Sequence, residues 1–202
     1  MTSPLGENIQ REWDNEPLSD ELWDALEAKK SNQATGLAML TDLASGGSAL
    51  AMMYLGHACV TDNGQASLVL GEEWLKRSAD AGSIEGRLQL AVHYQRQERW
   101  TDAEAELRAL VAQDYAPGMY ALGHLLYARH SGQKSVSEAI RYLKLAKAAG
   151  HLPATGLLSW IYRKEKFGLR GRVISHWHCA AKIPSAIWYL WRYPNSDRLR
   201  RG

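Results

Sequence analysis

Residues 114–151, which read DYAPGMYALGHLLYARHSGQKSVSEAIRYLKLAKAAGH, decide the fold of this chain. In the first half, small and apolar residues recur at spacings of three and four, which is typical of one helix face. These residues are Gly118, Leu122, Gly123 and Leu126. In the second half, the same spacing is carried by Ala139, Tyr142, Leu143 and Ala146. The stretch therefore predicts two helices joined by a polar loop.

Both ends of the second helix carry local signals. Ser135 and Glu138 match the S-x-x-E capping box, whose side chains satisfy two backbone donors at a helix start. Gly150 lies where a residue in the left-handed conformation is expected to end the helix. Because a single antiparallel helix hairpin cannot bury its own apolar face, the stretch requires similar neighbours.

The neighbouring sequence repeats the same hairpin. A small residue is expected near the start of each first helix, with separations of 35, 32 and 36 residues: Ala51, Gly86, Gly118 and Ala154. The next core position is leucine each time: Leu55, Leu90, Leu122 and Leu158. A small residue follows it: Gly56, Ala91, Gly123 and Ser159. The units end near Gly47, Gly82, Asp114 and Gly150. Agreement at several positions predicts a repeat array.

The repeats resemble the Sel-one-like repeat family, a relative of the tetratricopeptide repeat, over roughly residues 31–162. First helices carry the family pattern A-x-x-x-L-G-x-x-Y at Ala51, Leu55, Gly56, Leu90, Tyr94, Leu122, Gly123, Leu158 and Tyr162. Second helices carry A-x-x-W-Y-x-x-A-A-x-x-G-H at Trp74, Ala79, Gly82, Ala139, Tyr142, Ala146, Gly150 and His151. The middle unit departs from it, with Asp114 for the closing glycine and a shortened loop at 95–100, and the family's Gly-x-Gly-Val loop motif is absent throughout.

The resemblance implies an all-α, right-handed α-solenoid of antiparallel helix hairpins. We expect a flexible N-terminus, a solenoid and a basic, tryptophan-rich C-terminal extension with an irregular helical structure. Their ranges are 1–17, 18–164 and 165–202, and the repeat units cover about 18–47, 48–82, 83–114, 115–150 and a half unit at 151–164. Four polar residues are expected to cap or start helices: Ser19, Ser31 or Asn32, and Thr101 of a second capping box with Glu104.

Composition and charge narrow the function classes. The N-terminal sequence lacks the layout of a signal peptide, and no apolar run reaches the length of a membrane-spanning helix, so we expect a cytoplasmic protein. Cys59 and Cys179 have no motif spacing, which argues against a disulfide framework or a zinc ribbon. Residues 163–202 carry a net charge of +8 and residues 1–162 carry −6.

The tetratricopeptide register predicts which first-helix residues face the concave groove and contact a protein partner. These candidates are Met53, His57, Gln89, Val92, Tyr120, His124, Tyr127 and Trp160. A groove lined by such residues suits a peptide or a helix, since solenoids present extended concave surfaces. The alternative is that several of these side chains pack between helices.

The basic C-terminal extension has three interpretations. It caps the last repeat through Ile174, Trp177 and Ala181, it docks a protein, or it lies in an anionic membrane interface. The residues expected to contact a membrane or partner are Arg170, Arg172, Trp177, Lys182, Trp188, Trp191 and Arg192. Membrane contact would place the protein at the inner face of the membrane. Charge alone also permits nucleic-acid binding, but no recognised motif supports it.

Catalytic and metal sites are not expected. His176, His178 and Cys179 have metal-ligand chemistry, but residues two apart on a helix do not share a face. Phosphate-binding loops and hydrolase motifs are missing from the sequence. We therefore predict a non-catalytic adaptor or scaffold without cofactor or metal, which binds another protein. Similar repeat proteins act in signalling, envelope and polysaccharide-assembly systems. The alternative functions are a peripheral membrane protein that acts through its C-terminal segment, and an enzyme that uses the groove.

Overall fold

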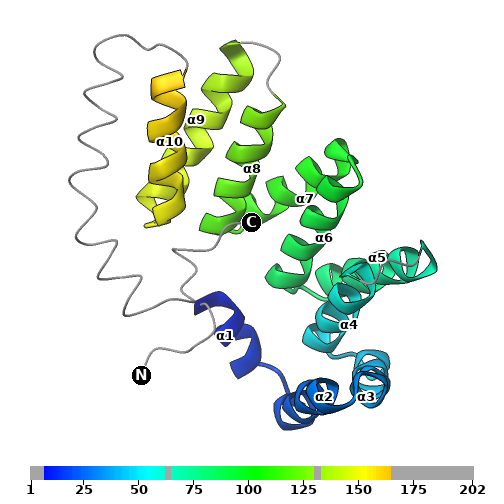
Figure 1. The fold of residues 1–202 in the computed structure, drawn as a ribbon. Coiled ribbons are helices and arrows are strands. Elements are labelled where there is room, and N and C mark those ends of the chain that lie inside the picture. The colour runs from blue at the N-terminus through cyan, green and yellow to red at the C-terminus, as the bar shows by residue number, and fades with distance from the viewer. Residues whose placement is uncertain (1–6, 62–64, 130–132, 165–202) are drawn as a thin grey trace. The chain divides into compact units, whose positions relative to one another are not determined.

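The structure, a computed structural model, describes residues 7–61, 65–129 and 133–164. Within these ranges every regular element is a helix (Figure 1). The helices are α1 (Glu7–Asp14), α2 (Ser19–Ser31), α3 (Gln33–Ser45), α4 (Ala49–Thr61), α5 (Gln65–Asp80), α6 (Ile84–Arg96), α7 (Trp100–Ala112), α8 (Ala116–Ala128), α9 (Gln133–Ala148) and α10 (Leu152–Lys164).

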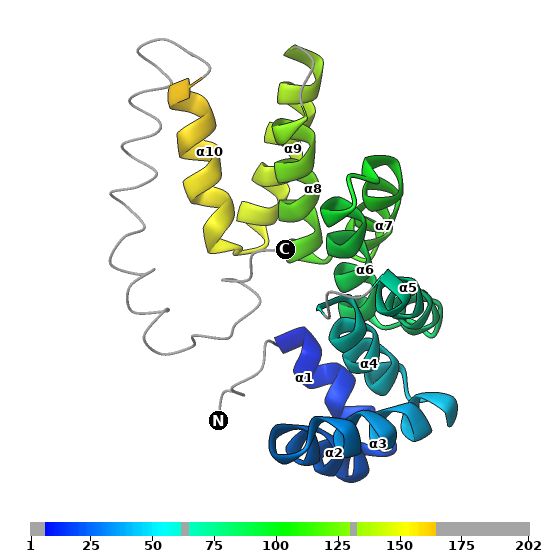
Figure 2. The ribbon, with the colours of Figure 1, turned by 45° about the vertical axis from the view of Figure 1, so that its right-hand side comes forward.

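The helices pair as consecutive hairpins. α2 packs on α3, α4 on α5 and α8 on α9, and α3 contacts α4, α5 contacts α6 and α9 contacts α10 (Figure 2). The prediction of an all-α solenoid of antiparallel helix hairpins is therefore confirmed. The chain divides into two compact units, residues 8–106 and a second that begins at Leu107, which are described separately below.

The predicted register of the first helices agrees with the helix bounds. α4, α6, α8 and α10 each contain 13 residues, and the predicted opening residue is the third residue of each: Ala51, Gly86, Gly118 and Ala154. The leucines four positions later are buried. The short middle repeat has a different cause from the one expected. α7 contains 13 residues, whereas α5 and α9 contain 16, so the second helix rather than the loop is shortened.

Small residues allow the two helices of a hairpin to approach closely. A Cβ atom on Gly56 would lie 2.8 Å from Cγ of Leu75, across the α4–α5 contact. A Cβ atom on Gly123 would lie 2.7 Å from Cγ of Leu143, across the α8–α9 contact. Both leucines are fully buried. The same close approach is therefore built into a hairpin of each unit.

Helix ends follow the predicted stop signals. Gly47, Gly82 and Gly150 have positive φ values of 103°, 93° and 86°, as expected for left-handed residues after a helix. Asp114 takes the equivalent position in the middle repeat with φ of 55°. Aspartate tolerates this region better than most residues with a side chain. The departure from the family pattern therefore keeps the backbone geometry.

Some predicted helix starts are wrong. α9 begins at Gln133 and α7 at Trp100, so Ser135 and Thr101 lie inside helices rather than at the capping position. Ser19 is likewise the first residue of α2 rather than its cap. The expectation for α3 is confirmed, since Oδ1 of Asn32 accepts hydrogen bonds from the amides of Ala34 and Thr35.

Helix α1 is the element that the sequence analysis did not predict. Residues 1–17 were expected to be flexible, and the structure describes a helix for Glu7–Asp14. This helix lies beside α2 and α4 in both ribbon views (Figure 1, Figure 2). Its contacts define the candidate site below.

Candidate binding surface on the first helices

Two first helices begin with the same capping serine. Oγ of Ser48 accepts a hydrogen bond from the amide of Ala51 at the start of α4, at 3.0 Å. Oγ of Ser83 accepts one from the amide of Gly86 at the start of α6, at 2.9 Å. Both serines are buried. Since each Oγ already serves as an acceptor, its own proton is available for a further partner.

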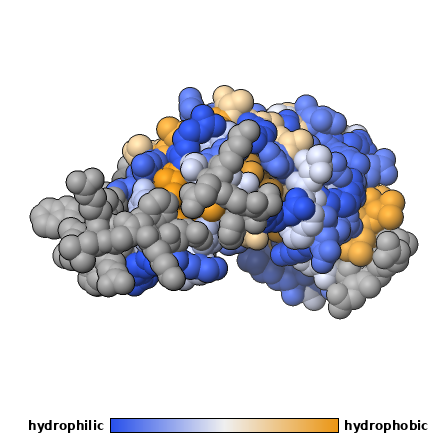
Figure 3. All heavy atoms as spheres, turned by 90° about the horizontal axis from the view of Figure 1, so that it is seen from above, coloured by the Kyte–Doolittle hydropathy of each residue, from blue (hydrophilic) through white to orange (hydrophobic). Residues whose placement is uncertain are grey.

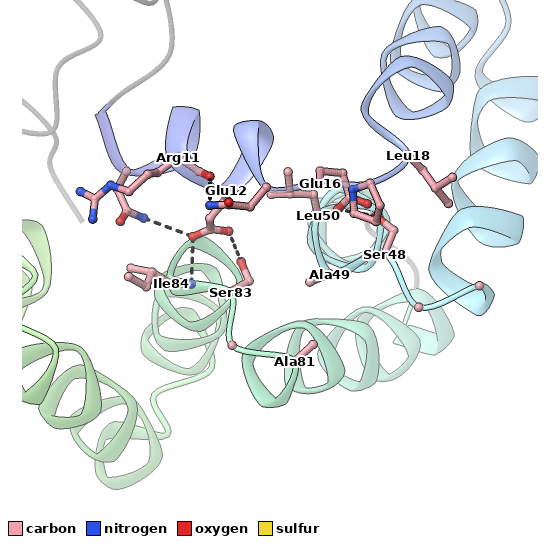
Figure 4. Close-up of a pocket in the computed structure, with 16 residues that line it drawn as sticks. Arg11, Glu12, Glu16, Leu18, Ser48, Ala49, Leu50, Ala81, Ser83 and Ile84 are labelled. Carbon is pink, nitrogen blue, oxygen red and sulfur yellow. Dashed lines mark hydrogen bonds between the residues drawn. The ribbon is translucent and has the colours of Figure 1, made fainter.

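Glu12 of α1 supplies that partner at α6 (Figure 4). Its Oε2 accepts a hydrogen bond from Oγ of Ser83 at 2.6 Å. Its Oε1 accepts bonds from the amides of Ile84 at 3.0 Å and Glu85 at 3.1 Å. The carboxylate therefore binds free backbone donors at the positive end of a helix, where an anion is stabilised.

Glu16 makes the equivalent contact at α4. Its Oε2 accepts a hydrogen bond from Oγ of Ser48 at 3.0 Å (Figure 4). Its other oxygen, Oε1, is buried and has no hydrogen-bond partner among the residues that the structure describes. Glu12 and Glu16 thus place carboxylates four residues apart on two successive repeats.

Trp13 gives the same segment an aromatic contact. Its indole Nε1 donates a hydrogen bond to the hydroxyl of Tyr54 on α4 at 3.3 Å. Its ring lies edge-on to Trp23 of α2, with centroids 6.1 Å apart, and tilted against Tyr54 at 6.2 Å. Such pairs stabilise a contact beyond the area that they bury. α1 therefore lies across α2, α4 and the start of α6.

A pocket of ≈ 450 Å³ lies between this segment and the helix starts. It is lined from one side by residues of 8–18 and from the other by the turns 46–50 and 81–84 (Figure 4). Polar side chains of both sides border it, including Asn8, Glu12 and Ser83. The segment therefore does not fill the space next to the helix starts.

The predicted groove residues of the first unit differ in how much of their side chains is exposed to solvent. Met53 is buried, with 5% of its surface exposed, and it contributes to packing. His57, Gln89 and Val92 are partly exposed. Burial lowers the pKa of His57, and the positive charges of Lys29 and Arg96 lower it further. Lys29 and Arg96 therefore place positive charge near His57.

The second unit contains two aromatic groups at predicted groove positions. Tyr127 is 4% exposed and packs edge-on against Trp160, which is 44% exposed, with ring centroids 5.4 Å apart. Nζ of Lys164 lies 4.8 Å from the Trp160 ring centroid. Trp160 is therefore held in place and still open to solvent.

The other group joins two predicted residues to a third that was not predicted. Tyr120 is partly exposed and His124 is exposed. The Tyr120 ring lies 6.3 Å from His124 and 4.8 Å from His151. His151 is buried, so its contact with Tyr120 lies in the interior of the unit.

A partly exposed ionic cluster joins α5, α6 and the turn before α7. Nη1 of Arg99 lies 2.7 Å from Oε2 of Glu72, and Nζ of Lys76 lies 2.7 Å from Oε1. Burial by itself would raise the pKa of Glu72, but the hydrogen bonds from Arg99 and Lys76 lower it overall. His93 is buried, with Nε2 3.6 Å from Glu72, and its burial lowers its pKa. This cluster ties α5 to α6 and to the turn before α7.

Comparison with solved structures finds the crystal structure of a protective antigen present in uropathogenic Escherichia coli strains, which displays an SLR (Sel-one-like repeat) fold. The TM-score is 0.63 at 18% sequence identity. This chain has the SLR fold. The match covers 90% of this chain and 42% of the antigen chain, so the chain spans less than half of that protein's length. No family model and no curated protein matches the sequence.

Several predicted site residues of this SLR chain lie outside the described residues. They are Arg170, Arg172, Trp177, Lys182, Trp188, Trp191 and Arg192, together with the metal candidates His176, His178 and Cys179. Within residues 7–61, 65–129 and 133–164, no three His, Cys, Asp or Glu side chains are grouped as a metal site. In the same ranges, no helix has the length and apolar character needed to span a membrane.

Sequence reasoning missed the contacts of α1 with the SLR helices. The acidic, polar composition of residues 7–16 concealed a helix whose partners are helix starts and the rings of Trp23 and Tyr54. One signal was present in the sequence. Glu12 and Glu16 are four residues apart, and serine follows glycine at both Gly47–Ser48 and Gly82–Ser83.

Proposed function

We propose that this SLR protein is a non-catalytic adaptor that binds a protein partner through exposed side chains of its first helices. The observation that carries the proposal is Trp160, a large aromatic side chain that is 44% exposed and fixed by Tyr127 and Lys164. Fixed aromatic side chains lose little conformational entropy on binding and dominate many interfaces.

Further support comes from the distribution of the other accessible residues. His57, Gln89, Val92, Tyr120 and His124 occupy the first-helix positions that face a partner in the related tetratricopeptide register, and all are at least partly exposed. Met53 and Tyr127 support these positions from the core.

A capture experiment tests the proposal. Wild-type protein and a His57→Ala/His124→Ala/Trp160→Ala variant are used as bait in native cell extract. The captured protein is then purified and its affinity measured for both. We expect the triple variant to bind at least ten-fold more weakly. Leu145→Ala, which truncates a 44% exposed side chain on the second helix α9, is the matched control and should bind normally.

Equal binding by wild type and the folded triple variant would contradict the first-helix assignment. The C-terminal extension would then be the place to test, as a docking segment or as a membrane anchor. Peripheral membrane association through that extension stays a prediction. Co-sedimentation of the full chain with anionic vesicles at low and high salt measures it directly.

A further inference from the structure

The contacts of residues 8–16 have the character of a bound ligand. Glu12 and Glu16 bind hydrogen-bond donors at the starts of α6 and α4, and Trp13 packs on two aromatic rings. Each contact is made by a side chain that another polypeptide could supply. The ≈ 450 Å³ pocket shows that the contact surface is larger than the segment that covers it.

The surface below this segment is suited to negative charge. We call it the Ser48/Ser83 surface, defined by Ser48, Ser83, Trp23 and Tyr54. Its two serines donate to carboxylates, and its helix starts carry partial positive charge. The positive charges of Lys29 and Arg96 lower the pKa of His57 on α4, the helix that Ser48 caps, and neither residue forms an ion pair among the described residues.

The covering segment is complementary to that surface. Residues 7–16, ENIQREWDNE, contain four acidic side chains and one basic side chain. Both carboxylates that contact the serines come from this segment, and the tryptophan between them occupies the aromatic part of the surface. A competing segment would therefore need the same groups, which are two carboxylates and an aromatic ring.

We propose that the Ser48/Ser83 surface is a docking site for an acidic segment of the protein partner, and that residues 8–16 are its intramolecular competitor. The partner segment carries two carboxylates four residues apart with an aromatic residue after the first. This inference rests on the proposed adaptor function and specifies the partner's chemistry. A segment tethered by a short linker competes at an effective concentration on the order of millimolar, so the partner must exceed its affinity to displace it.

The test measures binding of a fluorescent peptide with the sequence of residues 7–18 to the full chain. In wild type, the chain's own segment competes, so binding is weak. In a Glu12→Gln/Glu16→Gln variant, the tethered segment loses both charges, and we expect the peptide to bind at least ten-fold more tightly. A peptide with glutamine at both glutamate positions is the matched probe, and we expect it to bind neither protein.

A third variant tests whether the peptide binds at the Ser48/Ser83 surface. Adding Ser48→Ala and Ser83→Ala to the double variant should remove the gain in peptide affinity. Trp13→Ala provides a second way to weaken the tethered segment, in case the double variant fails to fold. Both carboxylates stay in this variant. It should bind the glutamate peptide more tightly than wild type does, by a smaller factor.

The proposal is overturned if folded variants with a weakened segment bind the peptide no better than wild type. It is also overturned if the glutamine peptide binds as well as the glutamate peptide, since the carboxylates would then be irrelevant. Either result leaves the adaptor function to be judged separately by the capture experiment. The converse outcome is that the triple alanine variant fails to capture the partner while the peptide binds to none of the proteins. That pair of results would support the adaptor function and exclude the Ser48/Ser83 surface as the docking site.

Discussion

The two compact units use one repeat frame with different chemistry at the helix starts. In residues 8–106, the residue after the left-handed glycine is Ser48 or Ser83, and its hydroxyl caps the helix and donates to a carboxylate. In the unit that begins at Leu107, the same position holds Tyr115 and His151. Tyr115 makes no side-chain capping hydrogen bond, and His151 packs against Tyr120.

This difference shows where the fold leaves freedom for function. The left-handed stop and the small residue two positions into each first helix are required for close packing. The identity of the residue directly after the stop is not required, because a helix start can be satisfied by water or by backbone groups as well as by a hydroxyl. The first unit uses that position to bind carboxylates, and in the second unit His151 uses it for aromatic packing.

The largest effect is expected where helices approach most closely in the first unit. A Cβ atom on Gly36 of α3 would overlap the backbone Cα of Lys29 on α2. Since backbone atoms cannot rotate away, Gly36→Ala should lower the free energy of unfolding by about 3 kcal/mol. Urea unfolding followed by circular dichroism measures the change.

The matched control lies in the second unit. Gly156 is exposed within α10, and nothing lies within 4 Å of a Cβ atom placed there. Gly156→Ala should raise the free energy of unfolding by about 0.5–1 kcal/mol, because alanine favours the helix. Gains of similar size in both variants would show that helix propensity, and not close approach, governs these glycines.

A smaller change in stability is expected at the helix caps, and it should distinguish the observed cap at Ser83 from the predicted cap at Ser135. Ser83→Ala removes the cap of Gly86 and a donor to Glu12, and we expect a loss of about 1.5 kcal/mol. Ser135→Ala should change stability by less than about 0.5 kcal/mol, since Ser135 lies inside α9. Thermal unfolding of the pair against wild type gives both values. A larger loss of stability for Ser135→Ala would support the predicted capping box of Ser135 and Glu138.

The sequence predicted the repeat frame well, because that frame depends on spacing. Small residues, leucines and left-handed stops recur every 32–36 residues, and each identifies a contact that any unit of this kind must make. The capping boxes failed because Ser135 and Thr101 satisfy a local pattern that the helix overrides. The backbone continues in helical conformation to Gln133 and Trp100, N-terminal to both predicted caps.

The candidate site was harder to predict, because it is made by contacts distant in sequence. Glu12 and Ser83 are 71 residues apart, and no local pattern connects an acidic segment to a helix start in the third hairpin. Burial also divided the predicted groove residues. Met53 and Tyr127 have the correct periodicity for the surface, but their large apolar side chains turn into the core.

The smallest expected effect is a pH dependence that comes from the first unit. Burial lowers the pKa of His93 on α6, despite the nearby Glu72 carboxylate, so the folded protein binds a proton at this imidazole less readily than the unfolded chain does. The unfolded chain binds a proton near pH 6.5, and stability therefore falls as the pH decreases below that value. His57 has the same direction of shift and adds to the loss.

We expect wild type to lose about 1 kcal/mol of stability between pH 7 and pH 5.5, and His93→Gln to lose about half of that. Amide hydrogen exchange, corrected for its intrinsic pH dependence, locates the effect. Protection should decrease in α5 and α6, where His93 and Glu72 lie, before it decreases in α8 and α9. An equal decrease in both hairpins would mean that the two units unfold as one, and that the acid sensitivity belongs to the whole repeat array rather than to the buried histidines of the first unit.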